Sequence, residues 1–324
     1  MKKPFRVGVL GVASIAKKRM FDAFMGHPDF TLQAISSREW RRAEAAARQL
    51  GCTAFQAYED LVTSAEIDVV YIPLPTNLHF PWALLAIRNG KHVLVEKPLC
   101  TSSEEARVLL AEAQQMGVGV GENFMFLHHS QTTWLKQTLV SGEIGQVRLF
   151  RAQFGFPPLG DKGNIRYSKE LGGGALFDAG CYPLRASLFF LDEPLEVRSV
   201  DLHFDRELQV DVWGSITLRT DSGIVAQLSF GFDNAYQCNV EFWGSKSKMT
   251  AHRAFTAGPE ATPAVTFESD GEARTVLLPP DDQAFNSLSA FSKMIQSSVK
   301  PAAGHTMLNQ ARILEATWKE GYGF

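Results

Sequence analysis

A run of small residues close to the start of the chain places the strongest constraint on its fold. Residues 5–10 are apolar enough to form a buried strand, and Gly11, Ala13 and Ala16 follow at the small positions of a tight turn into a helix. Such a turn lets backbone N–H groups approach a pyrophosphate, and the positive end of the helix dipole then faces the anion. Although alanine replaces two of the usual glycines, this spacing after a strand favours a dinucleotide site over a bare strand-to-helix connection. The predicted contacts to the dinucleotide are Gly11, Ala13, Ser14 and Ile15.

Strands and helices alternate through residues 1–122. Apolar stretches predict strands at 5–10, 32–36, 69–74, 93–96 and 118–121, and helices are predicted at 15–25, 41–50, 79–89 and from the capping residues 101–105 to 116. Because these strands are apolar on both faces, they predict a parallel sheet covered by helices on both sides, which is a Rossmann domain. Ligands of such sheets bind beyond the carboxyl ends of the strands, so the functional residues of this domain are expected in the loops there.

The loop after the second predicted strand contains Ser37 and Arg38, and Arg42 follows one turn into the next helix. An acidic residue at this point usually binds a free ribose 2′-hydroxyl, whereas a 2′-phosphate is bound by arginine and hydroxyl donors. Ser37, Arg38 and Arg42 therefore favour NADP(H) over NAD(H). Glu39 comes next in the chain and is interpreted as the solvated start of a helix.

The loop after the third predicted strand is rich in proline. Pro73, Leu74 and Pro75 are expected close to the nicotinamide ribose of the cofactor, because the two prolines fix the path of the chain there. His79 begins the next helix and is predicted as a further cofactor contact, with a helix cap as the alternative.

A charged pair, Glu96 and Lys97, ends the next buried strand, and Pro98 forces the chain to turn just beyond it. Lysine at the mouth of an apolar cleft stabilises a developing alkoxide, so Lys97 is a predicted catalytic residue. Both members of the pair are expected beside the cofactor. The alternative is a surface ion pair between them.

Beyond residue 122 the pattern changes to strands joined by hairpin turns. Strands are predicted along 147–156 and at 197–204, 212–220, 224–232, 239–243, 249–252, 265–268 and 275–278. Turn residues such as 221–223 (Asp-Ser-Gly) connect neighbouring strands, as in hairpins. Residues 123–324 are therefore predicted to form an α+β domain with a large, open, mostly antiparallel sheet. One face would be covered by helices, and the other, rich in Phe and Trp, is expected to bury against a second subunit or within a larger core.

The helix that follows the three glycines at 172–174 is predicted to carry further chemistry. Asp178 and Tyr182 are four residues apart, so they share one face of a helix. Pro183 predicts a turn that is irregular or close to the helix start, because it cannot donate a hydrogen bond to the carbonyl of Ala179. The glycines are expected to let the backbone approach a substrate. Alone, Asp178 would be interpreted as a helix cap and Tyr182 as a core residue, but together after the glycines they predict a functional pair.

The composition argues against several classes of partner. The net charge of −3 gives no electrostatic reason to expect nucleic acid or an anionic membrane. No apolar run approaches the ~18 residues of a membrane span, and no cluster of His, Cys and carboxylates predicts a metal site. The four cysteines are widely spaced, which favours free thiols in a reducing cytoplasm. They are Cys52, Cys100, Cys181 and Cys238.

Three separated motifs resemble those of the Gfo/Idh/MocA oxidoreductases. They lie at residues 11–16 (GVASIA), 96–99 (EKPL) and 172–183 (GGGALFDAGCYP). Tyr182 stands where members of the family more often have histidine. This tyrosine is shared with glucose–fructose oxidoreductase, NADP-dependent xylose dehydrogenases and dihydrodiol dehydrogenases.

Residues 122–131, together with 37–38 and 234–236, are similar to NADPH-dependent sugar-nucleotide 3-ketoreductases, although Ser130 replaces a frequent proline. The resemblance implies an NADP(H)-dependent enzyme that reduces a keto group on a nucleotide-linked sugar. Oxidation of a free aldose or a trans-diol is the alternative, and a non-catalytic NADP-binding sensor is the alternative from another class. Members of the family commonly pair through the C-terminal sheet, so a homodimer or homotetramer is expected.

Hydride transfer from a nicotinamide to a carbonyl creates negative charge on oxygen, which a cation and a proton donor can relieve. The hypothesis is that Lys97 and Tyr182 both hydrogen-bond this oxygen, that Tyr182 donates the proton and that Asp178 orients the pair. Lys97 is the alternative proton donor. Surrounding polar residues suit a hydroxylated ligand, and Arg166 suits a diphosphate. The predicted substrate-binding residues are Glu122, Asn123, Phe126, His128, Arg166, Tyr167 and Tyr236. For each polar residue of this set, a structural hydrogen bond is the alternative.

Overall fold

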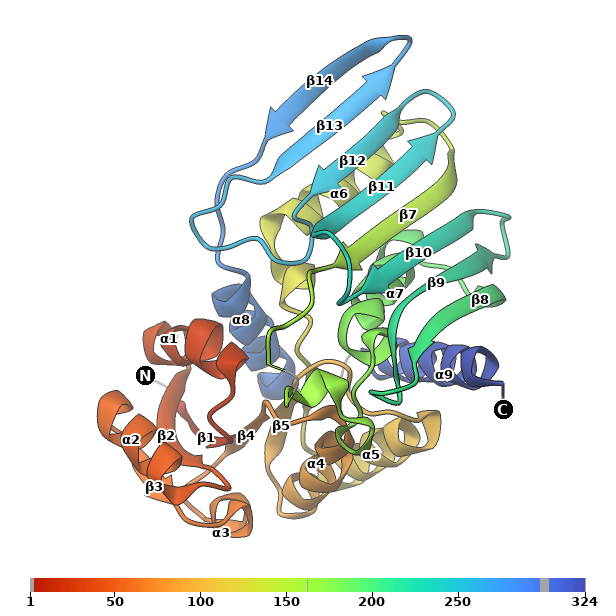
Figure 1. The fold of residues 1–324 in the computed structure, drawn as a ribbon. Coiled ribbons are helices and arrows are strands. Elements are labelled where there is room, and N and C mark those ends of the chain that lie inside the picture. The colour runs from red at the N-terminus through yellow and green to blue at the C-terminus, as the bar shows by residue number, and fades with distance from the viewer. Residues whose placement is uncertain (1–2, 162, 298–302, 324) are drawn as a thin grey trace. The chain divides into compact units, whose positions relative to one another are not determined.

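The computed structural model describes residues 3–161, 163–297 and 303–323. The chain divides into two compact units, one formed by Met1–Asn123 with Ala284–Ala311 and the other by Phe124–Gln283 with Arg312–Phe324 (Figure 1). The predicted boundary after residue 122 lies one residue from this division. The prediction differs for residues 284–311, which it assigns to the second domain and which the structure places in the first unit.

Within its described residues, the first unit has a six-stranded parallel sheet with the strand order β3-β2-β1-β4-β5-β6. The strands are β1 (Phe5–Leu10), β2 (Phe30–Ser36), β3 (Thr53–Phe55), β4 (Val69–Ile72), β5 (His92–Val95) and β6 (Val120–Glu122). The helices are α1 (Phe21–Gly26), α2 (Trp40–Leu50), α3 (Tyr58–Thr63), α4 (His79–Arg88), α5 (Ser103–Met116), most of α8 (Gln283–Gln296) and the first part of α9 (Ala303–Tyr322). The strand order reverses between β1 and β4, which confirms the predicted Rossmann fold.

The structure differs from the predicted elements mainly where these are short or irregular. The sequence predicts neither β3 nor α3, because three and six residues are too few for a periodic pattern to show. The predicted helix at 15–25 is a π-helical segment at Ala16–Met20 that continues into α1. The third predicted strand ends at Ile72 rather than at residue 74.

Two glycines explain why α8 packs within the first unit. A Cβ atom on Gly121 in β6 would lie only 2.8 Å from Cδ2 of Phe291 in α8. Gly119 permits the same close approach to Ile295. The helix therefore packs directly on the edge strand β6, and Phe291 also stacks on Phe30 of β2 with ring centroids 6.3 Å apart.

The second unit, in the part that the structure describes, has an eight-stranded sheet with the order β14-β13-β12-β11-β7-β10-β9-β8. The strands are β7 (Val147–Gly155), β8 (Leu195–Asp205), β9 (Val210–Thr220), β10 (Val225–Gly231), β11 (Gln237–Gly244), β12 (Lys248–His252), β13 (Ala264–Ser269) and β14 (Glu272–Leu277). Only β7 and β10 pair in parallel among these described strands, which confirms the predicted mostly antiparallel sheet. The helices α6 (Ser130–Ser141) and α7 (Cys181–Leu191) cover one face (Figure 1).

The two faces of this sheet differ in the residues they carry. In β7 the side chains of Phe150 and Phe154 are buried in the core beneath the helices, where Phe150 contacts Phe190 of α7. The sequence predicts that the opposite face is rich in Phe and Trp. The prediction is wrong for Phe, because the phenylalanines of the strands are buried in the core on the helix-covered face. Its large exposed aromatic residues are Trp213 (38% exposed) and Trp243 (53% exposed).

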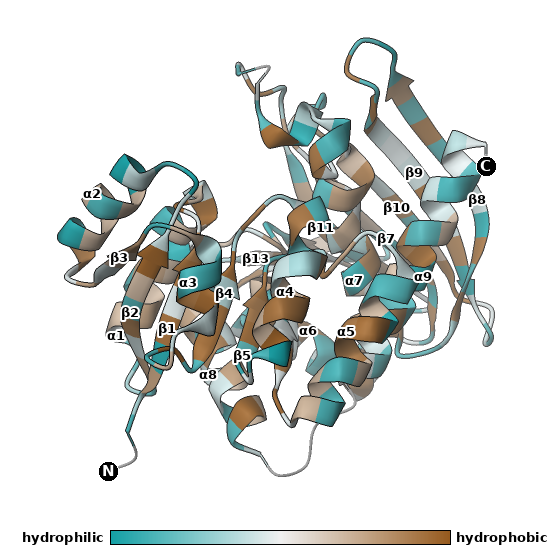
Figure 2. Cartoon of the chain, turned by 90° about the horizontal axis from the view of Figure 1, so that it is seen from below, coloured by the Kyte–Doolittle hydropathy of each residue, from teal (hydrophilic) through white to brown (hydrophobic). Residues whose placement is uncertain are grey.

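Hydrophobic residues of the first unit concentrate in its central strands, which are largely brown in Figure 2, whereas α2 is mostly hydrophilic. All four residues of β4 are buried, as expected for a strand with helices on both sides. Across residues 3–161, 163–297 and 303–323, no helix combines the length and the hydropathy that crossing a lipid bilayer requires.

Candidate active site

The glycine turn after β1 has the backbone geometry that the sequence predicts. Gly11 adopts a φ of 97°, and its N–H donates a hydrogen bond to the carbonyl of Ser36 at 2.7 Å. A Cβ atom at Gly11 would lie 3.1 Å from Leu74 and 3.7 Å from the hydroxyl of Tyr58, so the turn needs glycine for both its conformation and its space. Of the residues that follow, Ala13 and Ile15 are partly exposed and Ser14 is exposed.

The residues predicted for a 2′-phosphate lie beside this turn. Ser37 is buried at the end of β2, and Arg38 is exposed. Arg42 donates to the carbonyl of Val12 at 3.2 Å and pairs with Glu39 at 3.3 Å. The structure thus brings Arg42 to the glycine turn. A buried hydroxyl and two arginines form a donor set that fits a phosphorylated ribose.

The carboxylate of Glu96 anchors the loop that carries Lys97. It is buried, and it accepts hydrogen bonds from the hydroxyl of Tyr71 and the amide of Asn123, both at 2.7 Å. Burial raises the pKa of Glu96. This burial excludes Glu96 from a surface ion pair, and its carboxylate is an internal anchor of the loop. The contact of Glu96 with the cofactor stays a prediction. Lys97 is half-buried and precedes Pro98 through a cis peptide bond.

His79 connects the two loops that follow β4 and β5. Its Nδ1 lies 2.8 Å from the carbonyl oxygen of Pro98, and its Nε2 lies 2.7 Å from that of Leu74. Burial, together with the Lys97 ammonium, lowers the pKa of His79 to about 4. Both ring nitrogens face backbone carbonyls and the side chain is 1% exposed, so these contacts favour a structural role for His79. Its contact with the cofactor stays a prediction.

Two residues predicted for substrate binding are used inside the first unit. Asn123 is 1% exposed; its amide oxygen accepts from Ser287 at 2.8 Å, and its NH2 group donates to the buried carboxylate described above. Glu122 accepts from the N–H of Leu99 at 2.8 Å and from Gln310 at 3.3 Å. These contacts favour a structural hydrogen-bonding role for Asn123, and its contact with the substrate stays a prediction. Glu122 holds the backbone just after the lysine loop.

The three glycines of the second unit pack against the chain itself. The N–H groups of Gly173 and Gly174 donate to the carbonyls of Ser168 and Arg166 at 2.9 and 3.0 Å. A Cβ on Gly173 would lie 2.5 Å from the carbonyl oxygen of Arg166. The glycines were expected to let the backbone approach a substrate. In the structure, their backbone closely approaches the segment that carries Arg166.

Asp178 forms an ion pair with Arg166, whose Nε lies 2.5 Å from Oδ2. The carboxylate of Asp178 raises the pKa of Arg166 above its ordinary value. The guanidinium also lies 5.9 Å from the ring centroid of Phe156. Two predicted site residues that lie 12 positions apart in the sequence are thus in contact, and the aspartate holds the arginine in place.

Tyr182 lies in α7, directly after a π-helical segment at Leu176–Gly180, so the irregular turn predicted from Pro183 is confirmed. Its half-buried ring contacts four phenylalanines with centroid distances between 4.9 and 6.1 Å. They are Phe124, Phe126, Phe154 and Phe255. Phe126 is 2% exposed and supports the tyrosine ring, and its contact with the substrate stays a prediction.

The remaining predicted substrate residues have separate surroundings in the second unit. Tyr167 accepts from the N–H of Leu159 at 2.9 Å. Tyr236 is 45% exposed, and its hydroxyl lies 2.7 Å from that of Thr256. His128 is half-buried, and burial lowers its pKa. These three residues stay predictions for substrate binding.

Sequence reasoning missed three residues of the second unit that shape this site. Phe154 and Phe255 enclose Tyr182, and Asp211 binds the start of its helix. The alternation of β7 signals that Phe154 is buried. The sequence carries no comparable signal for Phe255, which follows β12, or for Asp211, a single acid near the start of a strand.

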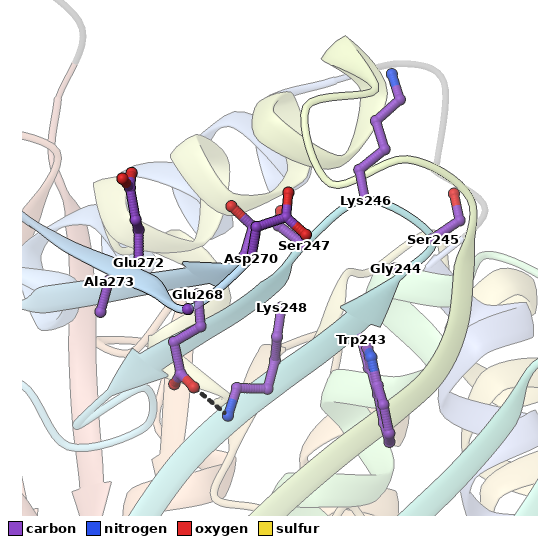
Figure 3. A pocket seen from close by; sticks show the side chains of 12 residues that line it. Trp243, Gly244, Ser245, Lys246, Ser247, Lys248, Glu268, Asp270, Glu272 and Ala273 are labelled. Atoms are coloured by element: carbon purple, nitrogen blue, oxygen red, sulfur yellow. Dashed lines mark ion pairs between the residues drawn. The ribbon is translucent and has the colours of Figure 1, made fainter.

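A cavity of about 500 Å³ lies elsewhere in the second unit, at the turns that join β11 to β12 and β13 to β14 (Figure 3). Lys248 and Glu268 point toward one another across it and form an ion pair at 2.9 Å. The lining also includes Trp243, Lys246 and Asp270. None of the predicted site residues lines this cavity.

Comparison with known proteins gives matches along nearly the whole chain. Residues 5–124 match the oxidoreductase family with an NAD-binding Rossmann fold, and residues 132–250 match the GFO/IDH/MocA C-terminal domain. The dTDP-3,4-didehydro-2,6-dideoxy-alpha-D-glucose 3-reductase of Saccharopolyspora spinosa is 39% identical, with 98% of this chain and 97% of the relative covered. An NADP+-dependent D-xylose 1-dehydrogenase of Haloferax volcanii is 32% identical over 91% of this chain and 90% of its own length.

Among solved structures, a 3-ketoreductase from Actinomadura kijaniata in complex with NADP and TDP-benzene superposes with a TM-score of 0.95. It shares 39% sequence identity, with 98% of each chain covered. The two-domain match, the extent of the similarity and the retained motifs agree with one another. This chain belongs to the Gfo/Idh/MocA oxidoreductase family.

Proposed function

We propose that this protein is an NADPH-dependent oxidoreductase that reduces the 3-keto group of a nucleotide-linked deoxy sugar. The observation that carries the proposal is the 39% identity with a dTDP-sugar 3-reductase over 98% of the chain. The residues that the reaction needs are present as Lys97, Asp178 and Tyr182. A sensor that only binds NADPH needs no proton donor, whereas a reductase does. The presence of these residues therefore favours an enzyme.

The residues that would hold NADPH are the glycine turn and the donors at the end of β2. Gly11 gives the backbone its close approach, and Ser37, Arg38 and Arg42 suit the 2′-phosphate. Residues 73–75 are proposed beside the nicotinamide ribose. When bound, NADPH supplies the hydride, and the protein's task is to orient the carbonyl and relieve its charge.

Arg38→Ala is expected to weaken NADPH binding by about 10–100-fold, because a hydrogen bond to a charged phosphate contributes about 1.5–3 kcal/mol. The affinity for NADH, which lacks that phosphate, should stay near its wild-type value. Fluorescence titration with both cofactors measures the change. Arg48→Ala, at the far end of α2, is the matched control. Equal losses for NADPH and NADH would contradict the assignment.

We propose that Tyr182 donates the proton to the carbonyl oxygen while Lys97 stabilises its developing charge. Free tyrosine has a pKa of ~10, and a neighbouring ammonium favours the phenolate and so lowers that pKa toward the working pH. As hydride adds to the carbonyl carbon, the C=O bond becomes C–O, and the phenol proton passes to oxygen. The product is the alcohol.

The ion pair of the second unit suggests a revised role for Asp178. Its carboxylate is bonded to Arg166, so we propose that it orients this arginine for the diphosphate of the substrate. Glu122 is proposed to act indirectly, through the backbone of Leu99.

Arg166→Ala should raise the KM for the nucleotide-linked sugar by about tenfold or more, because it removes a charge-assisted contact to the diphosphate. The dissociation constant of NADPH should not change. Steady-state kinetics with the sugar as the varied substrate measure the effect, and Arg198→Ala, on the exposed edge of the sheet, is the control. A KM equal to the wild-type value would remove Arg166 from this role.

We also propose that copies of the chain associate through the open face of the C-terminal sheet. Support comes from two exposed tryptophans on one sheet: Trp213 stacks on His203 at 4.9 Å, and Trp243 lies 6.0 Å from the guanidinium of Arg151. Trp243→Glu is expected to lower the molar mass in analytical ultracentrifugation. A monomeric wild-type protein would contradict the proposal. A cytoplasmic location is proposed from the four free cysteines.

The proposed function is tested by nicotinamide absorbance with a panel of substrates. NADPH should be consumed with nucleotide-linked 3-keto sugars. Formation of NADPH from NADP+ with xylose or a trans-diol would instead favour a dehydrogenase, a reading that the 32% identity with a xylose dehydrogenase supports. Tight NADPH binding without turnover on either set would favour a sensor.

A further inference from the structure

Asp178 and Tyr182 lie on one continuous helical stretch, and its beginning sets the position of both side chains. The stretch consists of the π-helical segment Leu176–Gly180 and α7. It begins just after Gly174, which adopts a φ of 110° that other residues rarely reach. Whatever holds this first turn therefore determines where the tyrosine hydroxyl points.

A buried carboxylate from a distant strand holds this turn. Asp211, the second residue of β9, is 1% exposed and accepts a hydrogen bond from the N–H of Leu176 at 2.6 Å. A Cβ atom on Gly174 would overlap Oδ1 of this carboxylate. The third glycine of the motif is thus required for the carboxylate to reach the helix.

Tyr322, at the end of α9, completes the arrangement. Its hydroxyl donates to Oδ1 of Asp211 at 3.0 Å and accepts the N–H of Asp211 at 2.9 Å. The ring is fixed by Trp318, stacked at 5.1 Å, and by the edge contact with Phe204 at 5.3 Å. Both hydrogen-bond partners of the Tyr322 hydroxyl therefore belong to Asp211, and the packing of the ring holds the hydroxyl beside this residue.

The charge of the carboxylate suits its position. Burial raises the pKa of Asp211 to about 6, and both carboxylate oxygens accept hydrogen bonds, one from the N–H of Leu176 and one from the hydroxyl of Tyr322. The N–H groups in the first turn of a helix lack partners within the helix, and the helix dipole favours a negative charge beside them. A buried carboxylate without such donors would be costly, so carboxylate and helix stabilise one another.

From these contacts we infer that Asp211 and Tyr322 are positioning residues for the reduction. They fix the start of the helix that carries Asp178 and Tyr182, and with it the direction of the proton-donating hydroxyl. The inference rests on the proposed function, and it adds that the last turn of α9 contributes to turnover through the carboxylate of Asp211.

The test compares Tyr322→Phe and Asp211→Asn with the control Asp68→Asn in the full-length protein. Asp68 is matched because its carboxylate also accepts a backbone N–H, that of Arg6 at 2.8 Å, and a side-chain donor, but it lies in the first unit. The measurements are kcat, KM for NADPH and for the keto sugar, the melting temperature, and hydrogen exchange of residues 174–182 without substrate.

Tyr322→Phe removes one hydroxyl and keeps the ring packing, so it should lower kcat by about tenfold while both KM values stay close to wild type. Hydrogen exchange at residues 174–182 should become faster. Asp211→Asn should lower kcat further, whereas Asp68→Asn should lower the melting temperature and leave kcat unchanged.

An unchanged kcat and unchanged exchange in Tyr322→Phe would overturn the inference, and so would a fall in kcat no larger than that of Asp68→Asn. If Asp211→Asn does not fold, Tyr322→Phe decides the question. An inactive wild-type protein would contradict the proposed function instead. In that case the exchange of residues 174–182 still tests whether Tyr322 and Asp211 hold the helix.

Discussion

Tyr182→Phe is expected to lower kcat for the keto sugar by about 10²-fold or more, because it removes the proposed general acid. The substitution keeps the ring, and with it the contacts to Phe126 and Phe154 at 6.1 and 4.9 Å, so the fold should be retained. The basic limb of the pH profile of kcat, which ionisation of the phenol would cause, should disappear. Steady-state kinetics between neutral and alkaline pH measure both effects.

Binding of NADPH provides the control for this variant. Tyr182 lies in the second unit, so its loss should leave the dissociation constant of NADPH at the wild-type value. Turnover equal to that of the wild type would exclude Tyr182 as the proton donor. A retained basic limb with lowered kcat would point to another ionising group.

Lys97→Met is expected to lower kcat by about 10²–10³-fold, since one lost donor to a developing oxyanion costs about 2.7–4 kcal/mol. Methionine matches the length of the half-buried lysine stem. The backbone around it is held independently by the hydrogen bonds of Pro98 to His79 and of Leu99 to Glu122, so the loop should keep its shape. Pre-steady-state NADPH oxidation isolates this step from product release.

The two variants together identify the principal proton donor. Lys246→Met, which removes an exposed lysine from the turn between β11 and β12, controls for the loss of one positive charge. If Lys97→Met is more damaging than Tyr182→Phe and also abolishes the pH dependence, Lys97 is the donor and Tyr182 assists it. A Lys97→Met enzyme with wild-type kcat would contradict both roles proposed for the lysine.

Local sequence patterns predict the fold well where one segment determines its own structure. The strand and turn at residues 5–11 are predictable because an apolar run and a glycine with positive φ are local features. The place of α8 is not predictable in this way, because it depends on the close approach of Phe291 to Gly121, which lies 170 positions earlier in the sequence. The elements β3 and α3 cannot be predicted from the sequence because they are too short to show a periodic pattern.

In the candidate site, too, contiguous motifs can be predicted from the sequence, and contacts between distant segments cannot. The spacing of Asp178 and Tyr182 and the loop of Lys97 are visible in the sequence, since each motif is contiguous. The inward roles of His79 and Asn123 are not, because their partners are a backbone carbonyl and a serine of α8. A polar side chain next to a catalytic motif can serve the motif or the ligand, and only its partners distinguish the two.

The most direct test of this account follows the hydride. The wild-type enzyme is given NADPH deuterated at C4 of the nicotinamide and a freshly prepared dTDP-linked 3-keto deoxy sugar, and the product is examined by NMR. NADPH should be consumed, and the deuterium should be bound to C3 of the sugar. Deuterium at another carbon, or no transfer while NADPH stays bound, would contradict the assignment of this protein as a 3-ketoreductase.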